Sequence, residues 1–252
     1  MLTPTDERLH RLPKAELHVH LDGSLRPATL LALARERDVE LPASDVVGLA
    51  RMMLVSGARN LEEYLEPFRL TLAVMQDAEA IERIAFELAE DYAAEDTCYL
   101  EVRFCPGLCT REGLTSAEVL DAALAGLARA EAAMDIRTAV IVCGLRSLPP
   151  AHSRSMAELA VSYMGRGVCG FDLAGAEHGY PVKEHTEAVR VAEVAGLPIT
   201  IHAGEGFGSP SIRQALEHGH ANRIGHATRL GEDPALLAAV REAARTRCGS
   251  SR

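Results

Sequence analysis

Short apolar runs alternate with amphipathic stretches along most of the chain, and this alternation is what most constrains its fold. The apolar runs predict strands, the first ending at His20 and the others covering residues 98–104, 139–145, 168–174, 198–203 and 223–227. The segments between them carry apolar residues at helical spacing. Strand, helix and strand in repetition indicate an α/β fold whose parallel strands are joined by helical crossovers.

The predicted helices differ in how clearly their ends are marked. One follows Pro27, the next covers residues 60–75, and a third covers residues 77–95 with Asp77 as its N-cap. Thr115 and Glu118 form a candidate capping box for a fourth. Further helices are expected at residues 152–165, 182–195, 209–218 and from about residue 233 onward.

The charge balance argues against one class of partner. A formal net charge of -10 over 252 residues does not provide the basic surface that nucleic acids or anionic membranes require, so a small molecule is the expected ligand. Residues 1–11 lack the apolar core of a signal peptide, and no apolar run approaches membrane-spanning length. We therefore expect a cytoplasmic protein with one domain over residues 1–252, because no linker rich in Pro, Gly or Ser divides it.

Reactive side chains lie at the carboxyl ends of successive predicted strands. In a parallel barrel these ends converge on one face, where such folds place their active sites. The candidates, in chain order, are His18, His20, Asp22, Asp172, Gly175, His202, Glu205 and His226.

The histidines point to a metal. His18 and His20 lie two residues apart, so a strand would place both imidazoles on one face. By themselves they could equally be a hydrogen-bonded pair on a half-buried strand. His202 supplies a third imidazole, and three nitrogens with a water make an open catalytic zinc site.

The remaining candidates each allow two interpretations. Glu205 is either a solvated loop residue or, if burial raises its pKa, a proton donor. His226 is either structural or a base and electrostatic stabiliser beside a metal-bound water. Gly175 either permits a turn or brings its amide close to a ligand.

Five segments in order resemble the motifs of the adenosine deaminase branch of the metal-dependent amidohydrolases. The resemblance implies a TIM (β/α)8-type barrel of the amidohydrolase kind and one Zn²⁺ held by His18, His20 and His202. It implies that Glu205 protonates the purine N1 and that His226 activates or orients the metal-bound water. It further implies that Asp22 meets the ribose and that the Gly175 amide contacts the purine ring. The segments are Glu16–Ser24, Tyr99–Phe104, Asp172–Gly175, His202–Glu205 and Arg223–His226.

The implied reaction is hydrolytic deamination of adenosine or deoxyadenosine to inosine or deoxyinosine and ammonia, a step of purine salvage. Adenine or a modified adenosine is the alternative substrate, because the pocket and not the metal selects among aminated purines. Leu61, Tyr64, Leu65 and Phe68 are similar to the family's apolar helix over the pocket mouth, although an amphipathic core helix explains them equally well.

The resemblance is incomplete near the carboxyl end. The family's Thr-Asp-Asp motif, whose first aspartate ligates zinc, should follow the final helix, but the sequence continues with an arginine-rich stretch. We therefore expect about six of the eight strands that close such a barrel, in a truncated or frameshifted deaminase. The missing carboxylate should impair catalysis, and an inactive fragment that binds purine or partner subunits, or fails to fold, is the alternative. The oligomeric state is not predicted.

Overall fold

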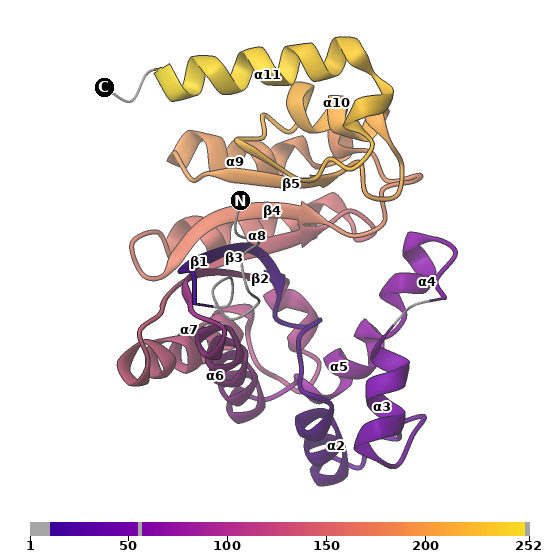
Figure 1. Cartoon of the computed structure of the whole chain (residues 1–252), viewed down its shortest axis with the longest axis vertical. Helices are drawn as coiled ribbons and strands as arrows, with labels where there is room; N and C mark the ends of the chain where they lie inside the picture. The colour runs from indigo at the N-terminus through magenta and orange to yellow at the C-terminus, as the bar shows by residue number, and fades with distance from the viewer. Residues whose placement is uncertain (1–10, 55–56, 250–252) are drawn as a thin grey trace, which may run out of the picture. The chain divides into compact units, whose positions relative to one another are not determined.

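The computed structural model describes residues 11–54 and 57–249, and Figure 1 shows their helices and strands. The expectations that concern residues 1–10 and 250–252 lie outside this part of the chain. The elements are β1 (Lys14–His20), α2 (Pro27–Glu36), α3 (Val46–Met53), α4 (Leu61–Leu65), α5 (Phe68–Val74), α6 (Ala78–Ala94), β2 (Thr97–Phe104), η1 (Pro106–Cys109), α7 (Ser116–Ala133), β3 (Arg137–Leu145), α8 (Pro150–Ser162), β4 (Val168–Ala174), η2 (Val182–His185), α9 (Thr186–Ala195), β5 (Ile199–Ala203), α10 (Ser209–Glu217), β6 (Arg223–His226), η3 (Leu230–Glu232) and α11 (Pro234–Gly249), where η marks a 3₁₀ helix.

The strands form a sheet in chain order, from β1 to β6. β1 with β2, β2 with β3, β4 with β5 and β5 with β6 are parallel pairs. Parallel neighbours need a crossover between them, and each connection carries at least one helix. The predicted α/β fold with parallel strands is therefore confirmed.

The chain divides into two compact units. The first comprises the residues up to 143 together with residues 159–169, and the second comprises residues 144–158 and the residues from 170 onward. Each unit has a buried core of its own, and each is described by itself below.

In the first unit, α6 and α7 lie side by side (Figure 1). Ile81, Ile84 and Leu88 lie on one face of α6, spaced three and four residues apart, and all are buried. Gly126 of α7 lies against the backbone of α6, because a Cβ atom at this position would lie 2.2 Å from the carbonyl oxygen of Glu82. The absence of a side chain at Gly126 therefore sets the distance between the two helices.

The connection from β1 to β2 carries a helical excursion, α2 to α5, before α6 (Figure 1). Our prediction of one helix over residues 60–75 is wrong, because α4 ends at Leu65 and α5 begins at Phe68. Pro67 accounts for the break, since proline has no amide hydrogen to donate and its ring clashes with the preceding turn. α3 was not predicted.

In the second unit, every residue of β5 is buried. A parallel strand covered on both faces is buried along its whole length in this way. The helix predicted over residues 182–195 begins as the 3₁₀ turn η2 and continues as α9. The residue that follows α9 is Gly196, and its φ of 72° is the left-handed conformation that commonly terminates helices.

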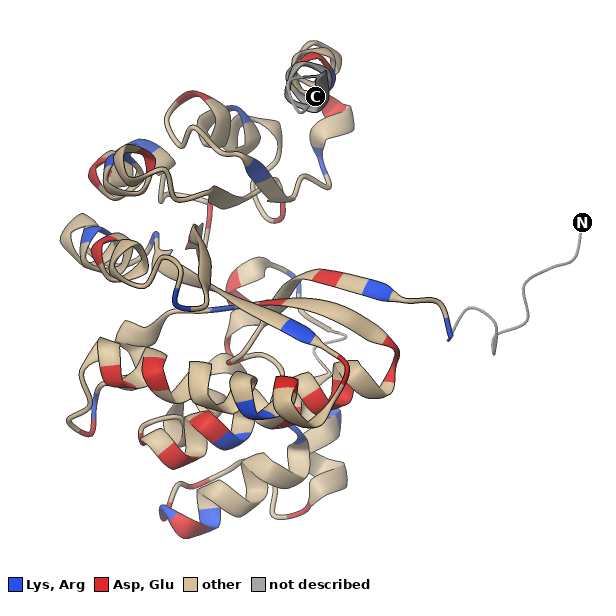
Figure 2. Ribbon diagram, turned by 90° about the vertical axis from the view of Figure 1, so that its left-hand side faces the viewer, with Lys and Arg blue, Asp and Glu red and all other residues tan. Residues whose placement is uncertain are grey.

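Acidic and basic residues both occur on the helices, as Figure 2 shows. Arg83 and Glu87 of α6 lie 2.8 Å apart, and Arg154 and Glu158 of α8 lie 2.9 Å apart, each pair one helical turn apart. Such exposed pairs add little stability, but they show that the two signs of charge are interspersed. Among the described residues, no helix combines the length and apolar character needed to cross a membrane.

Candidate active site

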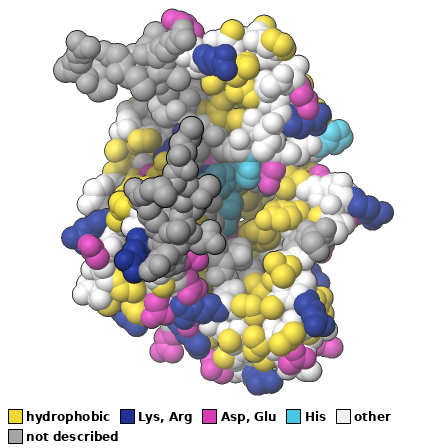
Figure 3. Space-filling view, in the orientation of Figure 1, with side chains coloured by type: hydrophobic (Ala, Val, Ile, Leu, Met, Phe, Trp, Pro, Cys, Tyr) yellow, Lys and Arg dark blue, Asp and Glu magenta, His cyan; other side chains and the backbone are white. Residues whose placement is uncertain are grey.

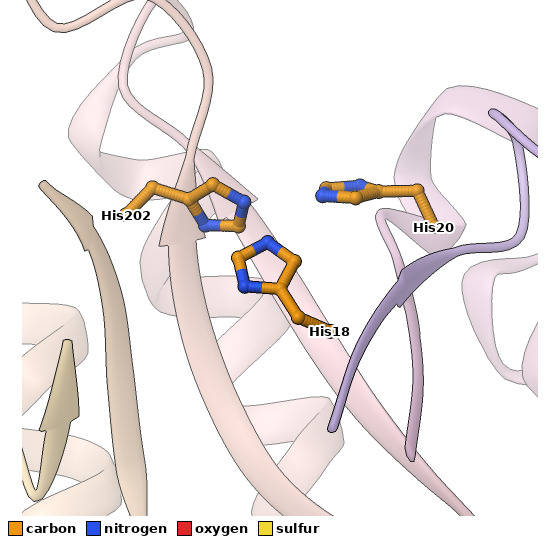
Figure 4. Close-up of side chains that lie close together, drawn as sticks. All are labelled: His18, His20 and His202. Atoms are coloured by element: carbon orange, nitrogen blue, oxygen red, sulfur yellow. The ribbon is translucent and has the colours of Figure 1, made fainter. Parts of the chain in front are cut away.

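The carboxyl end of β1 presents two imidazoles, both drawn in Figure 4. The centroids of the His18 and His20 rings lie 5.5 Å apart, as expected for residues two apart on a strand. The His20 ring also meets the edge of Phe68 at 6.1 Å. Both histidines are partly exposed.

A pocket of about 220 Å³ adjoins these rings within the first unit. His18, His20, Asp22, Tyr64 and Phe68 are among the residues that line it. Asp22 is 7% exposed, and one of its carboxylate oxygens lies 3.9 Å from Nδ1 of His20. The pocket thus joins an acidic group and two imidazoles to an aromatic wall, a composition typical of small-molecule sites.

The helical excursion supplies the apolar wall of this pocket. Of the residues expected over a pocket mouth, Tyr64 of α4 and Phe68 of α5 line it. Hydrophobic side chains also remain exposed on the excursion (Figure 3), where Val47 is 61% and Leu54 72% exposed. Tyr64 and Phe68 are therefore more than core residues of an amphipathic helix.

In the second unit, His202 ends β5 beside a buried carboxylate. Its Nδ1 lies 2.8 Å from Oδ2 of Asp172, which belongs to the neighbouring strand β4. The side chains are 4% and 0% exposed. A carboxylate beside one ring nitrogen is common behind histidine metal ligands. The donor chemistry of His202 therefore fits a metal ligand.

Glu205 and His226 also lie together in the second unit. Oε2 of Glu205 is 3.4 Å from Nε2 of His226, and each side chain is about one quarter exposed. Burial raises the pKa of Glu205 above its ordinary value, which favours the protonated carboxyl that a proton donor needs. The His226 ring lies 5.2 Å from that of His202, so the three side chains form one polar cluster.

Gly175 follows β4 with a φ of +92°. A Cβ atom at this position would meet Leu145 at 3.7 Å, an ordinary contact. The requirement for glycine is therefore conformational, because residues with side chains rarely adopt this backbone geometry. This supports the turn interpretation, and a contact of its amide with a ligand remains a prediction.

Sequence reasoning noted Asp172 at a strand end but gave it no role. Part of the signal was present in the sequence, because Asp172 and His202 both lie near the carboxyl ends of predicted strands. Their side chains meet because β4 and β5 are neighbours with Asp172 paired to Thr200, a register that spacing along one chain does not reveal. Arg146 and Glu177, two buried charged residues of the second unit, were not singled out at all.

The sequence profile of the adenosine deaminase family matches residues 13–250. This chain belongs to the adenosine deaminase family. Adenosine deaminases from Mycobacteroides abscessus and Mycolicibacterium vanbaalenii are 47% and 45% identical to it over 88% and 92% of its length. The chain spans 62% and 66% of the length of these two relatives.

Solved structures of related enzymes share the fold of this adenosine deaminase family member. Adenine deaminase from Arthrobacter aurescens gives a TM-score of 0.81 at 27% identity, covering 90% of this chain and 68% of its own. An amidohydrolase from Burkhoderia ambifaria, with bound Zn, gives 0.83 at 25% identity, covering 96% and 67%. The N6-mAMP deaminase of Arabidopsis gives 0.75 at 30% identity, covering 88% and 67%. The expected amidohydrolase type of α/β fold is thus confirmed.

Proposed function

We propose that this protein is a zinc-dependent hydrolase that deaminates adenosine or deoxyadenosine. The products are inosine or deoxyinosine and ammonia, which places the reaction in purine salvage, and we propose the cytoplasm as its location. The observation that carries the proposal is the Asp172–His202 contact next to Glu205, because a carboxylate-oriented imidazole and a raised-pKa carboxyl are the parts a metal-assisted deamination needs.

The proposed metal ligands are His18, His20 and His202, each offering one ring nitrogen. Imidazole nitrogens suit zinc, and the amidohydrolase from Burkhoderia ambifaria carries Zn. When bound, zinc would supply the Lewis acidity that activates water as a nucleophile.

The protein's own residues would carry the protons. Glu205, whose pKa is raised by burial, holds a proton and donates it to N1 of the purine, which makes C6 more electrophilic. His226, 3.4 Å from Glu205, orients the attacking water and accepts its proton. The oxygen of water bonds to C6, and His226 passes the proton it has taken from water to the amino nitrogen. The bond from C6 to that nitrogen then breaks and ammonia leaves, while the remaining hydroxyl proton returns to Glu205 as the carbonyl forms.

We propose that Asp22, Gly175 and two aromatic side chains contact the substrate. Asp22, buried in the wall of its pocket, would accept hydrogen bonds from the ribose hydroxyls, and the amide of Gly175 would contact the purine ring. The aromatic side chains of Tyr64 and Phe68 suit a planar base. The expected partner is therefore a purine nucleoside, not a nucleic acid or a membrane.

Adenine or an N6-modified adenosine is the second candidate substrate. Two of the similar solved structures are an adenine deaminase and an N6-mAMP deaminase. An interaction of Asp22 with ribose would favour adenosine over adenine, so the identity of the substrate depends on this contact.

Purified, zinc-supplemented protein tests the proposal. We expect the ultraviolet spectrum of adenosine to change only slowly to that of inosine, and more slowly still with adenine and N6-methyl-AMP. We expect Glu205→Gln to slow the change about 100- to 10,000-fold. Glu187→Gln, an exposed carboxylate in the first turn of α9, is the matched control and should leave the rate unchanged. Zinc and adenosine binding without inosine would instead identify an inactive purine-binding chain, and absence of zinc binding would refute the metal site.

A further inference from the structure

A buried carboxylate that the proposed mechanism does not use holds the turn after β5. Glu177 is 3% exposed and accepts hydrogen bonds from three successive backbone amides. Its Oε2 accepts from Gly204, and its Oε1 accepts from Glu205 and Gly206, each at 2.8 Å. One side chain thus satisfies every amide of residues 204–206.

Glu177 stays ionised in this position. Burial alone would raise its pKa, but the neighbouring Ser211 hydroxyl and the amides of Gly206 and Gly204 outweigh burial, and the pKa of Glu177 lies below its ordinary value. Hydrogen bonds to an ionised acceptor are stronger than those between neutral groups. The three amides are therefore held by a full negative charge.

Arg146 fixes the residue that precedes the turn. It is 2% exposed, and its Nη2 donates to the carbonyl oxygen of His202 while its Nη1 donates to that of Tyr180 at 3.3 Å. The backbone from His202 to Gly206 is thus held from both ends by buried charged side chains. Connecting segments are usually more mobile than the strands and helices they join. The hydrogen bonds from Glu177 and Arg146 restrain the backbone of this turn.

The turn carries Glu205, whose carboxyl must lie close to its reaction partners. Gly204 has a φ of +79°, a conformation that glycine adopts easily, and the chain bends at residues 204–207. Without a fixed turn, the Glu205 carboxyl would lose its position beside His226. A displacement of about 1 Å in a catalytic group costs about 100-fold in rate.

We propose that Glu177 is a positioning residue of the deaminase, which holds the amides of residues 204–206 so that Glu205 is placed to donate its proton. The inference rests on the proposed function. A purely structural cap on a turn would have the same hydrogen bonds, but it would affect folding and not the reaction of Glu205.

Glu177→Gln is the decisive variant. The new amide group can still accept from two backbone amides through its oxygen, but its NH₂ faces the Gly204 amide, so a donor meets a donor. We expect kcat to fall about 10- to 100-fold, with KM for adenosine and the zinc stoichiometry unchanged. Glu187→Gln again serves as the control.

A double-variant cycle separates positioning from general destabilisation. If Glu177 acts through Glu205, the Glu177→Gln/Glu205→Gln protein should be no slower than Glu205→Gln alone. The proposal would be overturned if the rate losses of the two single variants multiplied in the double variant. It would also be overturned if Glu177→Gln kept the wild-type kcat, or if its zinc content and melting temperature fell in parallel with its activity.

Hydrogen exchange gives a readout that does not need turnover. We expect the amides of residues 204–206 to be protected in the wild-type protein and to exchange faster in Glu177→Gln. If the wild-type protein protects these amides and binds zinc but deaminates none of the purines, the proposed function is refuted, and the positioning role of Glu177 with it. An active wild type with unprotected amides would refute the positioning role alone.

Discussion

Replacing Gly126 with alanine should destabilise the first unit, although alanine is the better helix former. In an open helix the change would stabilise by about 1 kcal/mol. Here the new Cβ would lie 2.2 Å from the carbonyl oxygen of Glu82 and 3.0 Å from Cβ of Ala85. The first of these contacts is with backbone, so no side-chain rotation relieves it and α6 must move away from α7.

Overpacking of this kind costs about 1–3 kcal/mol and occasionally more. A rigid backbone contact belongs at the upper end, so a cost of about 3 kcal/mol less the propensity gain of about 1 leaves a net loss of about 2 kcal/mol. For a chain of this size that corresponds to a fall in Tm of about 4–8 °C.

Urea unfolding followed by circular dichroism measures the change. Gly231→Ala is the control, because nothing lies within 4 Å of a Cβ at that position, and its stability should change by less than about 1 kcal/mol. A Gly126→Ala protein as stable as the wild type, or more stable, would refute the account of how α6 and α7 pack.

Three further predictions concern the metal, a helix end and pH. Asp172→Asn should weaken zinc binding about 10-fold and Asp172→Ala up to about 100-fold, measured by competition with a chromogenic chelator; equal affinities in all three proteins would remove Asp172 from the site. Thr115→Ala deletes the capping box of α7 and should cost about 1 kcal/mol in urea unfolding, whereas an unchanged midpoint would argue against the cap. His185 is 1% exposed, and burial lowers its pKa, so the unfolded chain binds more protons and stability should fall as pH drops below about 6.5. His185→Gln should melt with a weaker dependence on pH in this range, and an unchanged dependence would contradict the assignment.

The strands could be predicted from the sequence because each is a compact apolar run between polar segments. Residues 168–174 are β4 as predicted, and β5 and β6 differ from their predicted bounds by one residue. In a parallel sheet both faces are covered, so the pattern is nearly continuous and depends little on tertiary detail.

The helical excursion was predicted less well, for local reasons. α3 has its own N-cap, since Asp45 accepts from the amide of Gly48 at 2.9 Å, but the helix buries only Leu49. A helix with so little buried surface has a weak apolar period. The break at Pro67 was visible in the sequence, and the apolar spacing on either side of it was given too much weight.

The site residues followed from their positions at strand ends, but their contacts did not. His202 was predicted as a ligand, whereas its Asp172 partner emerges only from the register of β4 against β5. Glu177 and Arg146 lie in connections where single charged residues are ordinarily solvated. Their burial depends on the fold of the whole second unit, which no local pattern encodes.

The long excursion between β1 and β2 has a consequence for the order in which the chain folds. Glu16 pairs with Leu100, 84 residues away (100 − 16), whereas Tyr99 pairs with Arg137 after 38 residues (137 − 99). Closing the longer loop costs roughly 0.6 kcal/mol more in chain entropy, and contacts between distant residues form slowly. We therefore expect β2, β3 and their helices to associate first and β1 to dock onto them later. His18 and His20 would then arrive late in folding, when the polypeptide that receives them is already in place.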